Sequence, residues 1–363
     1  MTSTSESGQP NRGFIGVTPR PPTLEDESYL DFMEGVRNFT IRELFPVVGT
    51  QVVEGARRAG LPADGAQASP KELRAATDAI PIVGTWKRIM RSQQQMTWNK
   101  LQDSFAADRA SYTRALDAAE QQRPGGLEYD PDFQVPHYAK YPIHLQPGGY
   151  VGDDLAGYVF HHGTKVFYQG DNDQDELHQQ IVNTVREPAN GAVQRVLDLG
   201  CSIGQCTTLL KQRFPQAEVT GLDVSLPLLR YANRRAVDLD IEVRFRQGLA
   251  EQLPYPDGHF DAVLCYILFH EVPERLFQPI INEVFRVLRP GGSYTIVDAP
   301  NGKDLPAPNR FWLTYDAQYN CEPYSPAFVA TDLPALLTNA GFTGIEQAST
   351  DMFLSATTAV RPK

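Results

Sequence analysis

The sequence predicts an α/β fold: a doubly wound, mostly parallel seven-stranded sheet with a helical N-terminal domain. Short apolar runs alternate with helical segments through the second half of the chain, and a glycine-bracketed turn follows the first of these runs. Upstream, apolar residues recur at helical spacing. These observations predict four segments, which are a disordered tail (1–24), a helical domain (25–125), a connector rich in His and Tyr (126–174) and a sheet domain (175–363).

The composition of the chain argues against several classes of protein. The chain has 363 residues, 41% of them hydrophobic, and a net charge of -11, which argues against a general nucleic-acid binder. No run approaches the roughly 18 apolar residues of a membrane span. Its four cysteines form neither a CxxC pair nor a disulfide framework, and the N-terminus lacks a targeting pattern. We therefore expect a cytoplasmic protein with reduced thiols and no membrane span.

The N-terminal part is expected to be helical. Apolar spacing predicts helix over 28–60, with a break near Pro46. Ser69-Pro70 resembles an N-cap followed by proline in the first turn, so a helix should cover 71–80. Pro81 and Gly84 should interrupt it, and residues 85–122 should form one long helix or two abutting ones. This domain would cover a substrate or form a homodimer contact.

The connector combines tyrosines and histidines with several prolines and glycines. Such side chains could line a ligand cavity, and an equally good interpretation is a structured connector that packs on the sheet domain. If His161 and His162 lie on a strand, they point to opposite sides. No His-x-His or HExxH spacing appears, so no metal site is predicted. The candidate substrate-binding residues in this segment are His144, Tyr150, Tyr158, His162 and Tyr168.

The sheet domain should alternate strands and helices. The strands are expected at 195–199, 218–224, 242–247, 261–267, 293–299, 344–349 and 352–360. The helices are expected at 175–186, 205–213, 225–236, 273–288 and 332–340. In such a sheet a ligand binds beyond the carboxyl ends of the strands, beside the first one.

Two acidic residues at strand ends indicate which chemical groups that ligand carries. Asp223, about 20 residues after the glycine turn, can accept both hydroxyls of a ribose, although it could instead cap the helix that starts near Ser225. Asp198, just before the turn, is suited to a cationic amino group. Ser202 interrupts the dinucleotide fingerprint, and no Gly-Lys-Ser/Thr follows for a phosphate loop. The pattern favours a ribonucleoside with an ammonium group and no phosphate.

Four segments resemble the successive motifs of class I S-adenosylmethionine-dependent methyltransferases, particularly the ubiquinone and menaquinone C-methyltransferase group. They are 196–204 (VLDLGCSIG), 221–225 (GLDVS), 253–261 (LPYPDGHFD) and 285–292 (FRVLRPGG). The resemblance implies a Rossmann-like methyltransferase fold and S-adenosylmethionine as cofactor. It implies cofactor contacts from Asp198, Gly200, Cys201, Ser202, Gly204, Asp223, Val224, Leu249, Ala250, Glu251 and Cys265. Relatives commonly have an acidic residue where Leu249 stands, so another group must bind the adenine amino group here.

Methyl transfer is an in-line displacement that needs alignment and exclusion of water more than an elaborate catalytic group. If the nucleophile must lose a proton, His270 with Glu271 is the best-placed general base, although His270 could equally be a hydrogen-bonded structural residue. Segment 306–326 is expected to help cover the acceptor. Further candidate substrate contacts are Tyr266, Trp312 and Tyr315.

The sequence thus predicts methyl transfer from S-adenosylmethionine to a small, aromatic or amphipathic molecule. The alternative is a non-catalytic protein of the same fold that binds a partner through its helical domain. A nicotinamide-dependent redox enzyme ranks below both, because the glycine pattern disfavours a dinucleotide.

Overall fold

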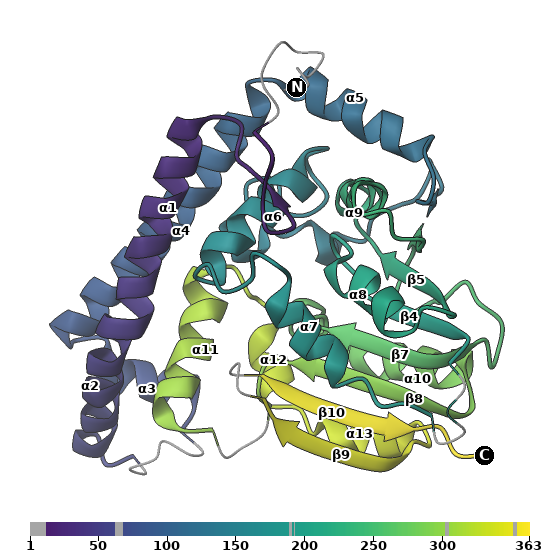
Figure 1. Ribbon diagram of the computed structural model, residues 1–363. Helices are drawn as coiled ribbons and strands as arrows, with labels where there is room; N and C mark the ends of the chain where they lie inside the picture. The colour runs from purple at the N-terminus through teal and green to yellow at the C-terminus, as the bar shows by residue number, and fades with distance from the viewer. Residues whose placement is uncertain (1–11, 62–67, 189–190, 192, 302–304, 351–353) are drawn as a thin grey trace.

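The computed structural model describes residues 12–61, 68–188, 191, 193–301, 305–350 and 354–363. Long helices form one side of the molecule and a twisted sheet with its helices forms the other (Figure 1). The segment α6 (Ala156–Phe167) and the helices α11 (Ala307–Tyr319) and α12 (Ser325–Val329) lie between the two sides (Figure 1). No helix in the described ranges combines the length and apolar character that a membrane crossing requires.

The N-terminal residues that are described are ordered, contrary to the expected tail. Strands β1 (Phe14–Ile15) and β2 (Thr18–Pro19) pair antiparallel, and Thr18 is buried. Helix α1 (Leu24–Asn38) then begins at Thr23, whose side chain forms a capping box with Asp26. The rest of the expected tail, residues 1–11, lies outside the described residues.

The helical domain contains the predicted succession of helices, but the helices begin and end at different residues than predicted. A π-helical segment, η1 (Phe39–Leu44), joins α1 to α2 (Phe45–Arg58), and Pro46 lies in the first turn of α2 because a missing N–H costs nothing there. Ser69 caps α3 (Pro70–Thr77), as predicted. Pro81 begins a helix instead of interrupting one. The remaining helices are α4 (Pro81–Ala106) and α5 (Arg109–Glu120).

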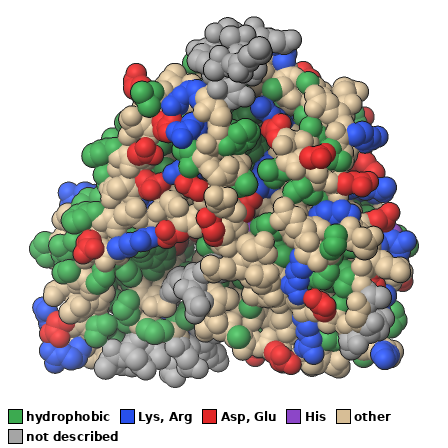
Figure 2. Space-filling view, viewed as in Figure 1, with side chains coloured by type: hydrophobic (Ala, Val, Ile, Leu, Met, Phe, Trp, Pro, Cys, Tyr) green, Lys and Arg blue, Asp and Glu red, His purple; other side chains and the backbone are tan. Residues whose placement is uncertain are grey.

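Exposed apolar side chains lie along this helical side. Phe32, Phe39 and Val47 are each more than half exposed and follow one another along α1, η1 and α2. Figure 2 shows hydrophobic side chains gathered at the left of the molecule, while acidic and basic ones are interspersed elsewhere on the visible face. A homodimer contact through this domain stays a prediction.

The connector contains more regular structure than expected. Its elements are β3 (Leu127–Glu128), the 3₁₀ turns η2 (His137–Lys140) and η3 (Ile143–Leu145), and the helix α6. Helix α7 (Glu176–Asn183) follows the connector, within the range predicted for the first helix of the sheet domain. His161 and His162 both lie on the helix α6 and not on a strand, so the condition under which they would point to opposite sides of a sheet is not met. His161 Nδ1 lies 2.7 Å from the Tyr231 hydroxyl, and His162 contacts the backbone oxygens of Tyr158 and Pro19. These two histidines hold the N-terminal strands and neighbouring helices in place.

Two glycines let α6 pack closely between its neighbours. A Cβ added at Gly157 would lie 2.3 Å from Tyr231 Cβ, on helix α9 (Leu226–Asp238). One added at Gly163 would lie 1.8 Å from Trp98 Cζ3, on α4. Both distances are far below van der Waals contact, so larger residues would push α6 away from the helices that frame the site.

The main sheet has eight strands in the described part of the chain, ordered β3-β6-β5-β4-β7-β8-β10-β9. Its strands after β3 are β4 (Arg195–Leu199), β5 (Glu218–Asp223), β6 (Arg244–Gln247), β7 (Phe260–Tyr266), β8 (Leu288–Asp298), β9 (Thr343–Ser349) and β10 (Ser355–Val360). The helices and turns between them are α8 (Gln205–Arg213), α9, η4 (Phe269–Glu271), η5 (Glu274–Leu276), α10 (Phe277–Val287) and α13 (Leu333–Asn339). Seven strands were predicted, and the eighth is β3, which pairs in parallel with β6.

This topology explains where a ligand can bind. The strands from β3 to β8 are parallel, and β10 runs antiparallel to β8 and to β9. Strand β4 pairs with β5 on one side and β7 on the other, so the connections leave it in opposite directions. Apolar clusters cover both faces of the sheet. The switch point lies beside β4, at the turn singled out in the sequence.

Candidate functional site

A cavity of about 910 Å³ lies at the carboxyl ends of β4, β5 and β7. Residues at or next to the carboxyl ends of these strands line it, including Asp198, Asp223 and Tyr266. Arg37 of α1 and Trp312 of α11 line it from the helical side. Most of its walls are apolar, so the helical domain and the sheet enclose a water-poor space together.

The glycine turn between β4 and α8 is a strained, closely held loop. Gly200, Ser202 and Gly204 all have positive φ, and the amide of Gly200 donates to the Leu222 carbonyl oxygen at 2.8 Å. Gly200 and Ser202 line the cavity, but Gly204 does not. A Cβ at Gly204 would lie 2.7 Å from the Phe245 ring, so packing requires glycine there, and the cofactor contact expected of this residue stays a prediction.

Asp223 connects the ends of β4 and β5. Its carboxylate accepts hydrogen bonds from the backbone amides of Ser202 and Ser225, each at 2.8 Å. Ser225 itself caps α9 with its own side chain, so Asp223 is not needed as the cap. Burial raises the pKa of Asp223. Each carboxylate oxygen keeps acceptor capacity toward the cavity, as the binding of two ribose hydroxyls requires.

Asp198 is the buried acid at the end of β4. It is 1% exposed, and its carboxylate accepts a hydrogen bond from the Thr207 hydroxyl at 2.6 Å. Burial, reinforced by the nearby Asp223, raises its pKa to about 7. A cationic ligand group would stabilise the ionised form, which agrees with the expected ammonium partner.

The segment after β6 offers an acid two positions beyond the one expected in relatives. Ala250 and Glu251 line the cavity, and Leu249 does not. Glu251 Oε1 accepts a hydrogen bond from the Tyr138 hydroxyl at 2.7 Å. Its other oxygen is buried without a hydrogen-bond partner in the described ranges. That oxygen is therefore a buried acceptor whose hydrogen-bonding capacity is unused in the described part of the chain.

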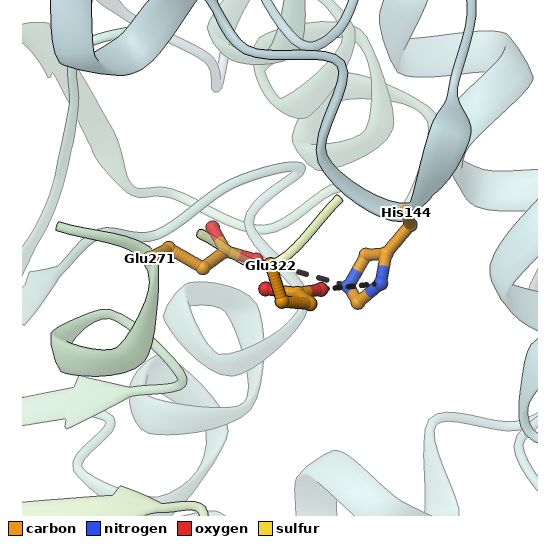
Figure 3. Close-up of side chains that lie close together, drawn as sticks. All are labelled: His144, Glu271 and Glu322. Atoms are coloured by element: carbon orange, nitrogen blue, oxygen red, sulfur yellow. Dashed lines mark ion pairs between the residues drawn. The ribbon is translucent and has the colours of Figure 1, made fainter. Parts of the chain in front are cut away.

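Three polar side chains in the cavity lining, those of His144, Glu271 and Glu322, lie close together (Figure 3). His144 Nδ1 is 2.8 Å from Glu322 Oε1, and His144 Nε2 is 3.8 Å from Glu271 Oε1. The hydroxyl of Tyr150 donates to Glu271 at 3.2 Å. Burial and the neighbouring Glu322 raise the pKa of Glu271 to about 7. Glu322 was not identified in the sequence, because no motif surrounds it.

His270 pairs with another acid that the sequence analysis missed. Its Nδ1 lies in a very short contact with Asp298 at the end of β8, and its Nε2 is 4.0 Å from Glu322. Burial alone would lower the pKa of His270, but Asp298 and the other carboxylates outweigh it and raise the pKa to about 10. His270 is then an imidazolium near neutral pH. The general-base role expected for it does not fit this arrangement.

Most of the other predicted residues meet in this one cavity. Those that line it are Asp198, Gly200, Cys201, Ser202, Asp223, Val224, Ala250, Glu251, His144, Tyr150, Tyr168, Tyr266, His270, Glu271 and Trp312. Four further candidates besides Gly204 and Leu249 lie elsewhere. Cys265 is in the core of the sheet, Tyr158 and His162 pack with Phe105, and Tyr315 packs against Trp86. The substrate and cofactor contacts expected of these four stay predictions, and the cavity lining does not support them.

Comparison with known proteins agrees with the geometry. A family model described as a methyltransferase domain matches residues 196–292. Demethylmenaquinone methyltransferase of Thermus thermophilus is 38% identical over 124 residues, 34% of this chain and 54% of that protein. A fatty-acid O-methyltransferase of Mycolicibacterium smegmatis is 36% identical over 138 residues, 37% of this chain and 49% of the relative.

A third relative is matched over more of its length. An uncharacterised methyltransferase of Synechocystis sp. is 36% identical over 156 residues, 42% of this chain and 69% of the relative. The chain spans about half the length of the first two relatives. In both of those the similarity covers little more than a third of this chain.

Proposed function

Because the chain belongs to the class I S-adenosylmethionine-dependent methyltransferases, we propose that it transfers a methyl group from S-adenosylmethionine to a small amphipathic or aromatic acceptor. The observation that carries this proposal is the single cavity shared by the cofactor motifs and an apolar chamber with a polar end. The non-catalytic alternative predicts cofactor binding without turnover.

The strand ends supply the cofactor contacts. Asp223 would accept the ribose hydroxyls, Asp198 would face the ammonium group, and Glu251 would accept from the adenine amino group. The strained turn of Gly200 and Ser202 lets the backbone approach the ligand closely. This set binds a ribonucleoside with a positive charge and offers no phosphate loop.

The remaining lining residues of the cavity indicate the polarity of the acceptor. Large apolar groups and Arg37 line the cavity on the helical side, and another region of its lining holds His144, Glu271 and Glu322. An acceptor with an apolar body and one polar reactive group fits both regions. The apolar wall residues contributed by the helical domain and the connector are Ile41, Phe45, Phe160 and Phe167.

Transfer itself requires little from the protein beyond alignment. The acceptor atom attacks the methyl carbon, the carbon–sulfur bond breaks, and its electron pair remains on sulfur as S-adenosylhomocysteine forms. A proton lost by an O–H acceptor would pass to Glu271, whose pKa is raised to about 7 by burial and by Glu322. The enclosed chamber excludes water from the sulfonium. The imidazolium of His270, held by Asp298, would donate a hydrogen bond to the polar group of the acceptor.

A panel of acceptors tests the proposal. The protein is incubated with S-adenosylmethionine and naphthoquinols, phenols, fatty acids or small polar amines, and S-adenosylhomocysteine release is measured. We expect turnover with acceptors that have an apolar body and little with ethanolamine or glycine. Equal rates for both groups would contradict the acceptor class, and cofactor binding without release by any acceptor would favour the non-catalytic alternative.

The pKa of Asp198 predicts how cofactor binding depends on pH. The ionised carboxylate favours a cationic ligand, so affinity should be full above pH 7 and fall up to about tenfold per pH unit below it. Titration calorimetry with S-adenosylmethionine between pH 5.5 and 7.5 measures this. Asp198 interacts by hydrogen bond or by charge with the following neighbouring groups: Thr207, Asp223, Cys201, Cys206 and Cys265.

A variant isolates the contribution of Asp198 from that of Asp223. Asp198→Asn keeps an acceptor for the Thr207 hydroxyl but cannot ionise. Its affinity should be low at pH 7.5 and nearly flat toward pH 5.5. If the variant keeps the full pH dependence of the wild type, another group controls it.

A further inference from the structure

The polar end of the cavity has the composition of a metal site. One ring nitrogen of His144 and one oxygen from each of Glu271 and Glu322 lie within 4.8 Å of one another. Imidazole and carboxylate are ligands that Zn²⁺ and related ions use in proteins. We propose that His144, Glu271 and Glu322 bind one divalent transition-metal ion, with Zn²⁺ as the reference ion.

Glu322 gives an independent reason to expect a cation. The residue is 2% exposed, and neither of its carboxylate oxygens has a hydrogen-bond partner among the described residues. Its 2.8 Å contact with His144 pairs two groups without the alignment of a hydrogen bond. A buried carboxylate is costly unless it is hydrogen-bonded or coordinates a cation. A metal ion would coordinate the oxygens that the protein leaves without a hydrogen bond.

The backbone adopts a conformation that non-glycine residues rarely show at one ligand and at the residue directly before another. His144 has φ 56°, and so does Cys321, directly before Glu322. The carbonyl oxygen of His144 accepts hydrogen bonds from Trp98 Nε1 at 2.7 Å and Gln94 Nε2 at 2.9 Å. Such conformations persist where the surroundings impose them, and they concentrate at functional sites. The helical domain thus holds His144 at this end of the cavity.

The spacing needs only a small adjustment. Ligand atoms bound to Zn²⁺ at about 2.0–2.2 Å lie roughly 3–4 Å from one another. The ligand atoms lie within 4.8 Å of one another, so the cluster would close by up to about 1–2 Å, within the reach of side-chain rotation. Three protein ligands from one His and two Glu leave a position for water or a substrate oxygen, as in catalytic zinc sites. The ion would lie in the chamber proposed for the acceptor.

The competing arrangement is a metal-free ion-pair network. The His144 ring lies between the two carboxylates, with Nδ1 toward Glu322 and Nε2 toward Glu271. A protonated ring could bridge both without any ion. This arrangement predicts no saturable metal binding at the cluster, so the two are separated by a binding measurement.

Metal binding is measured directly on the full chain. Protein treated with a chelator and dialysed is titrated with Zn²⁺ by calorimetry, and with Co²⁺ by visible absorption. We expect about one equivalent bound, and no displacement by excess Ca²⁺, which prefers sites made only of oxygen ligands. His144→Ala and Glu322→Gln should each lower the affinity at least about tenfold.

The control is His137→Ala, which removes an exposed histidine outside the cluster and should bind Zn²⁺ like the wild type. Affinity for S-adenosylmethionine checks that each variant is folded. Absence of saturable binding, or equal Zn²⁺ affinity in His144→Ala, Glu322→Gln and wild type, would overturn the proposal. Since the readout is bound metal, failure here is distinct from failure of methyl transfer.

Discussion

Asp223→Asn is expected to weaken S-adenosylmethionine binding about 100-fold. The variant removes the charge that would accept two ribose hydroxyls, and hydrogen bonds to a charged group contribute about 1.5–3 kcal/mol each. A loss of about 3 kcal/mol corresponds to roughly two orders of magnitude in Kd. In wild type, each carboxylate oxygen accepts a hydrogen bond from a backbone amide, one from Ser202 and one from Ser225. The side-chain nitrogen of asparagine cannot accept, so one of these two hydrogen bonds is lost. Titration calorimetry at pH 7.5 measures the change.

The matched control for this variant lies on the same strand. Glu218→Gln neutralises an exposed acid at the opposite end of β5, outside the cavity. Its affinity for S-adenosylmethionine should equal that of the wild type. If Asp223→Asn binds within twofold of the wild type, Asp223 does not hold the ribose, and the cofactor assignment fails at its most specific residue.

Gly163→Ala should be among the most destabilising single substitutions in the helical core. The new methyl group would lie 1.8 Å from the Trp98 ring, which is 2% exposed and donates its indole hydrogen bond to the His144 backbone. The ring cannot move without breaking that bond. We expect a loss of about 3 kcal/mol or more, seen as a fall in Tm on the order of 5–10 °C.

Gly84→Ala provides the contrast, because it also replaces a helical glycine. A Cβ at Gly84, on α4, meets no atom within 4 Å among the described residues. Alanine favours a helix over glycine by up to about 1 kcal/mol, so Tm should stay constant or rise slightly. Equal melting temperatures for Gly163→Ala and Gly84→Ala would show that the contact between α6 and α4 is looser than described.

The sheet and most of the residues that line the cavity at its strand ends were predictable because they depend on local patterns. Apolar runs located β4, β5 and β7, and the rule that parallel strand ends share one edge brought Asp198 and Asp223 together. The two-residue strand β3 was missed, since two residues carry no periodicity. It extends the sheet only through its pairing with β6.

The acceptor end could not be predicted in full, because its residues meet only through tertiary packing. Glu322 is far from His144 in the sequence, and nothing near either residue signals the contact. Asp298 ends a buried strand, but its pairing with His270 depends on the turn after β7. The sequence analysis expected His270 to act as a general base. Its pairing with Asp298 keeps the ring charged at neutral pH, and a charged histidine donates a hydrogen bond instead of accepting a proton.

The most direct test of methyl transfer follows the methyl group itself. S-adenosylmethionine labelled with ¹³C in its methyl group is incubated with the protein and an accepted naphthoquinol or fatty acid, and the products are analysed by mass spectrometry. We predict one labelled methyl group on the acceptor for each S-adenosylhomocysteine formed, and loss of both products in Asp223→Asn at sub-saturating cofactor. Label that stays on S-adenosylmethionine with every acceptor, while the protein still binds the cofactor, would contradict an enzymatic role.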